Sequence, residues 1–401
     1  MAEADCEHKR GIMDTPGFKP SARAHVEPFR AMAVMAAANR LKAAGSKVLS
    51  LAVGQPAAPA PRAAREAAQA MLAHGRVAYT DAMGRADIRE AIAGHYEQAH
   101  GVVIDPRRVM ITSGASAGFN IAFLAAFDVG ARIAIASPGY PAYRNIMRAL
   151  GIEPVEIAVG PTEDYVLTAD RLEGVFAERP FQGVLIANPA NPTGTMTSPE
   201  DFRAIVEFCD RRGVRFISDE IYHRLGFGKP EVSALEFTQS AVVVNSFSKY
   251  YAMTGWRIGW AVLPEDLVEV SERIGQNLYI SASEISQVAA LAALGASEEL
   301  DAVRETYRRN RERMIAELPG IGFRDIAPID GAFYAYAAIP DGDWNATQFA
   351  KALLDESLVA VTPGIDFDPV SGARFVRLSY ACDETSLAEA LERMGHFVTR
   401  R

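Results

Sequence analysis

A lysine on a short polar loop is the residue best suited to chemistry in this sequence. Lys249 lies in the stretch 245–257 (NSFSKYYAMTGWR), which follows an apolar run at 241–244 that predicts a buried strand. Ligands of an open α/β sheet bind beyond the carboxyl ends of its strands. A lysine placed there, with Arg257 eight residues later, can bind a phosphate and form a Schiff base. The alternative, a surface lysine in a turn, does not require the aromatic residues around it.

The order Ser246-x-Ser248-Lys249, followed by Arg257-x-Gly259, resembles the lysine motif of the class I and II aminotransferases. These are fold type I enzymes that carry pyridoxal 5'-phosphate (PLP). The resemblance covers the chain from about residue 30 to residue 395. It implies that Lys249 forms a Schiff base with PLP and that Ser246, Ser248 and Arg257 help to hold the coenzyme.

The strands and helices that must position this loop can be predicted from the sequence pattern. Strand and helix patterns alternate between about residues 60 and 295, which favours an α/β fold with a doubly wound, mostly parallel sheet. We expect a large PLP-binding domain over 61–295 and a smaller α+β domain over 29–60 and 296–401. Residues 1–28 have three prolines and mixed polarity, which predicts an irregular N-terminal arm.

The segment after residue 264 is expected to be richer in helices. A long helical tract is predicted from about Ser283 through Arg313. The charged run Arg304–Arg313 within it favours a solvated face over a binding patch.

A turn of small residues follows the strand predicted at 109–112 and precedes a helix. Gly114, Ala115 and Ser116 leave backbone N–H groups available there, and a helix N-terminus favours an anion. Such a turn is a weak signal alone, but ahead of the lysine motif it predicts a phosphate element. Some relatives have Thr or Lys at the position of Ala115, so one side-chain contact to the phosphate is expected to be absent.

Four further residues are expected to contact the coenzyme ring. An aromatic residue at a strand end can stack on a pyridine ring, and the resemblance places Tyr140 there. Asn191, in a segment with two Asn-Pro pairs, offers an amide to the ring hydroxyl. Asp219 at a strand end can pair with the pyridinium nitrogen, and Tyr222 can donate to the ring oxygen. The alternatives are a packed turn tyrosine for Tyr140 and a helix N-cap or a surface acid for Asp219.

Substrate binding is expected at the junction with the smaller domain. Gly54 permits close backbone approach, and relatives use this amide near the substrate carboxylate, although a plain turn is the alternative. Arg377 lies in a predicted apolar strand, where a guanidinium is suited to bidentate carboxylate binding. A structural ion pair is its alternative. Asn191 is expected to contribute to both coenzyme and substrate binding.

The resemblance also implies a homodimer with a shared active site. In the family, a tyrosine at the position of Tyr79 reaches the coenzyme phosphate of the neighbouring subunit. The alternative is a core tyrosine at the start of a helix.

These assignments predict a PLP-dependent aminotransferase that works by a ping-pong mechanism. Lys249, Asp219 and Tyr222 are its expected catalytic residues, with Lys249 as the base that moves the α-proton. The substrates are an amino acid and a 2-oxo acid. A PLP-dependent lyase that catalyses β-elimination is the alternative, because the same site supports it. A non-catalytic PLP-binding regulator is not expected, since residues 1–30 are too short for a helix-turn-helix extension.

Composition argues against several other classes. The net charge of -9 without a long basic run argues against nucleic acid or an anionic membrane as a main partner. Three scattered cysteines form no disulfide framework and no metal site, so a cytoplasmic protein without a metal is expected. Met1–Arg10 has no apolar core of a signal peptide, and no apolar run is long enough to span a membrane.

The residues expected near the substrate favour a donor with a neutral side chain. Tyr79, Tyr140 and Tyr143 are neutral aromatics, and Ala115 stands where some acid-accepting relatives have Lys. Burial of a second substrate carboxylate without a partner costs several kcal/mol. An arginine of the arm, Arg23 or Arg30, is the residue that can defeat this expectation.

Overall fold

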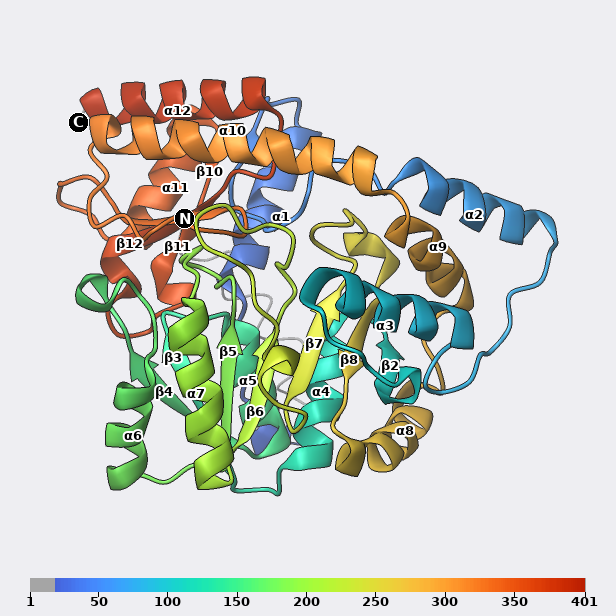
Figure 1. Ribbon diagram of the computed structural model, residues 1–401. Helices are drawn as coiled ribbons and strands as arrows, with labels where there is room; N and C mark the ends of the chain where they lie inside the picture. Colours follow the sequence, from blue (N-terminus) through green and yellow to red (C-terminus); the bar gives the residue numbers. More distant parts are fainter. Residues whose placement is uncertain (1–18, 401) are drawn as a thin grey trace.

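A seven-stranded sheet forms the centre of the computed structural model, which describes residues 19–400 (Figure 1). The strand order is β2-β8-β7-β6-β5-β3-β4, and only β8 runs opposite to the other strands. The strands are β2 Val109–Thr112, β3 Arg132–Ser137, β4 Glu153–Ala158, β5 Gly183–Ala187, β6 Arg215–Asp219, β7 Val242–Ser246 and β8 Gly259–Val262. The predicted α/β fold with a mostly parallel sheet is confirmed.

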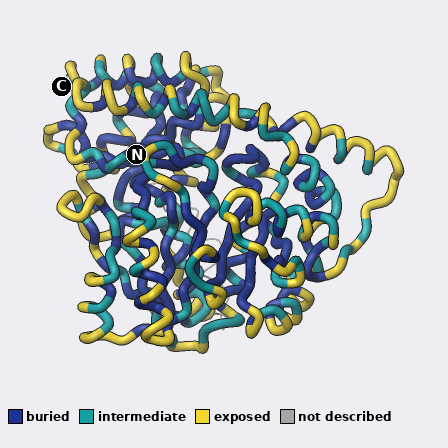
Figure 2. The backbone as a smooth tube through the Cα atoms, in the orientation of Figure 1, coloured by how far each residue is buried: buried dark blue, intermediate teal, exposed yellow. Residues whose placement is uncertain are grey.

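Helices cover both faces of this sheet, and each face has its own apolar core. Alternate residues of one strand point to opposite faces. In β7, Val243 therefore belongs to the core that includes residues of α3, α6 and α7, whereas Val242 and Val244 belong to the core that includes residues of α4, α5 and α8. The helices of this part are α2 Arg62–Ala73, α3 Ala86–His100, α4 Ala115–Ala126, α5 Pro141–Leu150, α6 Ala169–Glu178, α7 Pro199–Arg212, α8 Glu265–Tyr279 and α9 Glu284–Leu294. The strands between the helices are largely buried, apart from the edge strand β4 (Figure 2).

The remaining elements come from both ends of the chain. Strand β1 (Leu49–Ser50) pairs in parallel with β10 (Val359–Ala360), and α1 (Arg30–Ala43) packs beside them. A three-stranded sheet has the order β11-β12-β9. The other elements are β9 Tyr334–Ala338, β11 Thr362–Pro363, β12 Phe375–Ser379, α10 Ser297–Ile321, α11 Ala346–Ser357 and α12 Glu384–Thr399, with α10 and α12 lying side by side (Figure 1). This pairing supports the proposed smaller domain, whose boundaries stay a prediction.

The predicted single helical tract from Ser283 through Arg313 is wrong. The helix α9 ends at Leu294, and α10 begins at Ser297 and continues to Ile321. Gly295 lies in the break, where its low helix propensity weakens continuation.

The charged run within α10 is a solvated face only in part. Arg308 makes ion pairs with Glu305 and Glu312 at the surface. Arg304, by contrast, donates to the carbonyl oxygen of Gly226 (2.7 Å), and Arg311 donates to that of Ile329. These two arginines therefore tie α10 to neighbouring loops.

The predicted N-terminal arm is described only from Lys19 onward. Its residues 1–18 lie outside the described part of the chain, and residues 19–28 form an exposed segment with one short 3-10 helix, Ala22–Ala24. Between residues 19 and 400, no helix has both the length and the apolar character needed to cross a membrane. The same range has no cluster of His, Cys, Asp and Glu that could hold a metal ion.

Candidate active site

A cavity of about 250 Å³ lies at the carboxyl ends of β6 and β7, between the large sheet and the C-terminal elements. This is the position expected for a ligand of an open α/β sheet. The predicted site residues that line it are Gly54, Ala115, Ser116, Tyr140, Asn191, Asp219, Tyr222, Ser248, Lys249, Arg257 and Arg377. The fold thus brings together residues from almost the whole length of the chain.

Lys249 enters the cavity from the loop that follows β7. Its Nζ donates to the carbonyl oxygen of Gly54 at 2.6 Å. The hydroxyl of Ser246 accepts from the N–H of Ser248 (3.0 Å), which fixes the loop immediately before the lysine. Burial, followed by the positive charge of Arg377, lowers the pKa of Lys249 to about 7. The amine can therefore be unprotonated near neutral pH.

Asp219 faces the cavity at the end of β6. One of its carboxylate oxygens accepts from the N–H of Ile221 at 3.0 Å, and the other accepts from the hydroxyl of Tyr143. Burial raises the pKa of Asp219 to about 6, against these hydrogen bonds and the nearby charge of Lys249. A buried carboxylate held in this way is suited to pair with a cationic ligand atom, and Asp219 is not a helix N-cap.

Tyr143 as the partner of Asp219 was missed by sequence reasoning, which treated it only as a neutral aromatic wall. The signal was available in its spacing from Tyr140. Residues three apart on a helix lie on one face, so both tyrosines of the 140–143 turn point to the cavity.

Arg377 lies on β12 and is only 3% exposed. Its guanidinium donates to the side-chain oxygen of Asn191 (2.9 Å) and to the carbonyl oxygen of Ala52 (2.7 Å). Its Nε has no partner. Both observed acceptors are uncharged, which is unlike the structural ion pair considered as an alternative. A buried guanidinium with this environment is suited to bind a carboxylate.

Gly54 and Tyr334 lie so close together that only glycine fits. A Cβ added at Gly54 would lie 1.7 Å from the hydroxyl oxygen of Tyr334. That hydroxyl forms a 2.8 Å hydrogen bond with the hydroxyl of Tyr222. Tyr334 comes from β9, far from the other motifs, and no sequence pattern singled it out. It links the substrate side of the cavity to Tyr222.

Arg257 lies against the N-terminus of α4. Gly114 has a φ of +77°, and a Cβ there would lie 2.5 Å from a terminal nitrogen of Arg257. Arg257 itself has a φ of 51° and donates to the carbonyl oxygen of Thr254 at 3.0 Å. Bare backbone at Gly114 thus lets a guanidinium approach the first turn of a helix. The pair is suited to an anion such as a phosphate.

The outer wall of the cavity is apolar. Phe29 and Met32 contribute from the start of α1, and Ala142 and Ile146 from α5. The ring of Phe29 meets that of Tyr140 edge to face, with centroids 5.9 Å apart. Asp366 holds this end of α1 through the backbone N–H groups of residues 30 and 31. None of these wall residues was identified from the sequence.

Three predicted site residues do not line the cavity. Gly114 lies behind it, where it accommodates Arg257. Ser246 lies beneath the loop, and its hydroxyl donates to that of Ser248. Tyr79 is 79% exposed in a loop after α2, so it is not the core tyrosine considered as an alternative.

Comparison with known proteins gives a consistent result. The family model described as aminotransferase class I and II matches residues 46–394. The chain is 45% identical over 381 residues to valine--pyruvate aminotransferase of Mycobacterium tuberculosis, covering 94% of this chain and 97% of that protein. It is 31% identical over 385 residues to aspartate aminotransferase of Bacillus subtilis, covering 93% of this chain and 97% of that protein.

Solved structures show the same likeness in three dimensions. A crystal structure of an aminotransferase from Mycobacterium tuberculosis matches with a TM-score of 0.93 at 44% identity, covering 96% of this chain and 100% of that chain. Aspartate aminotransferase from Thermus thermophilus with maleate matches with a TM-score of 0.87 at 30% identity, covering 94% and 99%.

Proposed function

Because this chain belongs to the class I and II aminotransferases, we propose that it moves the amino group of a neutral L-amino acid to a 2-oxo acid with Lys249 as the central base. The enzyme is a PLP-dependent aminotransferase that acts on amino acids and 2-oxo acids. The lyase alternative has no support from these relatives. The observation that carries the proposal is the buried, low-pKa amine of Lys249, which lies in the cavity, donates to the carbonyl oxygen of Gly54 and feels the charges of Arg377 and Asp219.

The residues of the cavity fit the coenzyme. Arg257, Ser248 and the first turn of α4 would hold its phosphate, and Gly114 leaves the space that Arg257 needs. Asp219 would pair with its ring nitrogen, with Tyr140, Asn191 and Tyr222 around the ring. When bound, PLP withdraws electrons from the α-carbon of an attached amino acid, which acidifies the α-proton.

The chain's own residues then have separate tasks. Arg377 would bind the α-carboxylate of the substrate, with Gly54 beside it. The Nζ of Lys249 would take the α-proton and return it at a neighbouring carbon, a role that its pKa of about 7 permits. Asp219 would keep the ring nitrogen protonated, and the apolar wall around Phe29 would exclude water from the reacting atoms.

A neutral donor is proposed from the charges that line the cavity. Among the described lining residues, the cations are Lys249, Arg257 and Arg377, and each already has a task. The wall available to a substrate side chain is apolar. A donor such as valine, which the name of the Mycobacterium tuberculosis relative specifies, is compatible with this wall.

We expect neutral donors to have higher kcat/KM than aspartate or glutamate, by about tenfold or more, because an unpaired buried carboxylate costs several kcal/mol. The measurement compares alanine, valine, methionine and phenylalanine with the two acidic donors, using pyruvate and 2-oxoglutarate as acceptors. As a control, Ile146→Arg places a cation in the apolar wall and should move the ratio toward acidic donors. An acidic donor that leads by about tenfold in the unmodified enzyme would refute the assignment of the cations.

A homodimer with shared active sites is proposed from an exposed apolar patch. Val77 and Tyr79 lie in the loop after α2, and Leu278 and Ile280 lie at the end of α8; all four are exposed. The two segments are tied together, since the N–H of residue 80 donates to the hydroxyl of Ser281 (3.3 Å). Exposed apolar residues gathered in this way are typical of a protein interface. Contact with a second copy would explain why Tyr79 does not reach the cavity of its own subunit.

Mixing inactive Lys249→Ala chains with Tyr79→Phe chains is expected to give activity above that of either parent. If Tyr79 serves the neighbouring subunit, one site of each heterodimer carries both lesions and the other carries none. Activity after mixing and native mass spectrometry of the mixture are the measurements. Confirmed heterodimers without any gain in activity would show that Tyr79 serves its own subunit.

The cytoplasmic localisation expected from the cysteines stays a prediction.

A further inference from the structure

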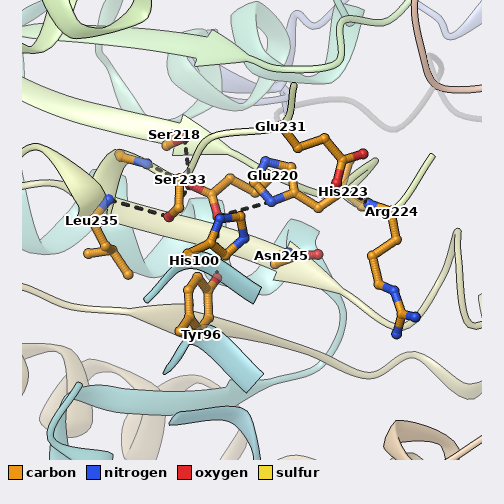
Figure 3. A network of polar contacts seen from close by, with 12 residues as sticks. Tyr96, His100, Ser218, Glu220, His223, Arg224, Glu231, Ser233, Leu235 and Asn245 are labelled. Carbon is orange, nitrogen blue, oxygen red and sulfur yellow. Dashed lines mark hydrogen bonds and ion pairs between the residues drawn. The ribbon is translucent and has the colours of Figure 1, made fainter. Parts of the chain in front are cut away.

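A second buried carboxylate, that of Glu220, lies directly beside Asp219 in the chain, and Figure 3 shows the polar contacts around it. The N–H of Glu220 donates to the carbonyl oxygen of Val244 at 2.9 Å, so the pairing of β6 with β7 continues through this residue. Successive side chains of an extended strand point to opposite faces. Asp219 therefore faces the cavity, whereas Glu220 and Ser218 face α3. Glu220 is fully buried, and no step of the proposed reaction uses it.

Hydrogen bonds fix both oxygens of the Glu220 carboxyl. Oε1 accepts from the hydroxyls of Ser218 (3.1 Å) and Ser233 (2.8 Å) and from the N–H of Ala234 (3.0 Å). Oε2 accepts from the hydroxyl of Tyr96 at 3.4 Å. Donors from three separate segments thus converge on one carboxyl, which anchors the chain immediately after Asp219.

The same carboxyl belongs to a titratable network that leads toward the surface. The ring of His223 lies 3.6 Å from Oε2, and the rings of His223 and His100 have centroids 5.4 Å apart. His100 in turn contacts Glu236 at 2.9 Å. The titratable and charged groups packed around Glu220 are Asp219 on its own strand, His95, Tyr96 and His100 on α3, and His223, Arg224, Glu231 and Glu236 on the segment after β6.

The pKa values of two of these groups, Asp219 and Glu220, lie near neutral pH. Burial raises the pKa of Glu220 to about 7, and the charge of His100 opposes that rise. Burial lowers the pKa of His223 to about 4, so this histidine is neutral in the range where Glu220 titrates. Burial is the main cause of the raised pKa of Asp219, and the negative charge of Glu220 adds to that rise. The charge behind the sheet is therefore coupled to the carboxylate that faces the cavity.

We propose that Glu220 is a positioning residue of this enzyme: it anchors the end of β6 that presents Asp219, and its charge state sets how tightly Asp219 holds a proton in the cavity. This inference rests on the proposed role of Asp219. Above the pH at which Glu220 ionises, its negative charge strengthens the hold of Asp219 on a proton or on a cationic partner. Below that pH, Glu220 is neutral and the hold is weaker.

The direct test is Glu220→Gln in the full-length holoenzyme, because the amide has nearly the same shape and carries no charge. Two probes are followed against pH. The infrared carbonyl band of a protonated carboxyl reports Glu220 itself, and the visible absorption of bound PLP reports proton binding at the coenzyme. We expect the variant to lose the infrared band that titrates near neutral pH. We also expect its absorption midpoint to move to lower pH by about half a unit or more, since a nearby negative charge has been removed.

Glu236→Gln is the matched control, because it removes an equal charge at the outer end of the network. The pH midpoint of the coenzyme absorption should move in Glu236→Gln by less than half the shift expected in Glu220→Gln. If Glu220→Gln does not fold, His100→Asn replaces it. Loss of a positive charge beside Glu220 should raise the pH at which the infrared band disappears, and the coenzyme absorption should change over that same higher pH range.

Equal shifts in the two Glu→Gln variants, or no shift in either, would overturn the proposal and leave Glu220 a purely structural residue. For His100→Asn, an infrared band that moves while the coenzyme absorption does not change would overturn the proposal as well. If instead Asp219 does not contact the coenzyme, as the proposed function requires, Asp219→Asn would leave the coenzyme spectrum unchanged. The infrared band of Glu220 would still titrate in that case.

Discussion

Replacement of Lys249 by alanine is expected to lower transamination by about four orders of magnitude or more, while the protein stays folded and still binds PLP. Lys249 is the group placed to move the α-proton, since its Nζ lies in the cavity and its pKa is about 7. The phosphate contacts proposed for Arg257 and the ring contact proposed for Asp219 would not depend on this amine, so PLP binding should persist without a covalent bond. Single-turnover kinetics and the coenzyme spectrum of the purified variant are the measurements.

Lys229→Ala is the matched control for this loss. Lys229 pairs with Asp330 at 3.0 Å and does not line the cavity. Its removal should leave kcat within about threefold of the unmodified enzyme, because this half-buried pair lies outside the cavity. Substantial transamination by the Lys249→Ala chain, at more than about a hundredth of the original rate, would mean that another group moves the proton.

Asp219→Asn is expected to retain PLP and to slow proton abstraction by two to three orders of magnitude, a loss of about 3 to 4 kcal/mol of transition-state stabilisation. Asparagine keeps the size of the side chain and can still accept from the N–H of Ile221, but it carries no negative charge. Without that charge the ring nitrogen loses its ionic partner. The single-turnover rate with a saturating donor measures the effect on chemistry alone.

Tyr143→Phe separates the charge of Asp219 from its hydrogen bond. The variant removes the hydroxyl that donates to Asp219 but leaves the carboxylate in place. A rate loss of about tenfold is expected, in keeping with one hydrogen bond to a charged group. A single-turnover rate of Asp219→Asn close to that of the unmodified enzyme would contradict the role of the carboxylate. So would a loss in Tyr143→Phe as large as that in Asp219→Asn.

Short motifs at strand ends made much of the cavity predictable. Lys249 and Asp219 each follow a run of buried apolar residues, so the local sequence placed each of them at the same edge of one sheet. Arg377 was predictable for a different reason. It lies within an apolar strand, where a charged side chain requires a partner.

Contacts between distant segments were not predictable in this way. Tyr334 and Gly54 meet only because β9 and the segment after β1 are folded against each other. No sequence motif in either segment indicates this contact. The spacing of Tyr143 from Tyr140 indicated the cavity, but it did not reveal that the hydroxyl of Tyr143 donates to Asp219, which comes from another segment. Glu220 had no assigned role because its partners, Tyr96, Ser233 and Ala234, come from other segments.

Secondary structure was missed where its pattern was weak. Strand β4 has exposed and half-buried positions among its buried ones, as expected at a sheet edge, and its glutamates break the apolar run. Strand β8 directly follows the lysine motif and is only 259–262 in extent. The break between α9 and α10 depends on Gly295, a residue that helices often tolerate.

The central claim, that Lys249 is the lysine that holds the coenzyme and moves the proton, has a direct chemical test. Borohydride reduction of the holoenzyme makes the bond between the coenzyme aldehyde and its lysine permanent, and mass spectrometry of the digested protein then identifies the modified peptide. We expect one labelled lysine per chain, Lys249, and no label in Lys249→Ala. A label on any other lysine of the unmodified enzyme would contradict it.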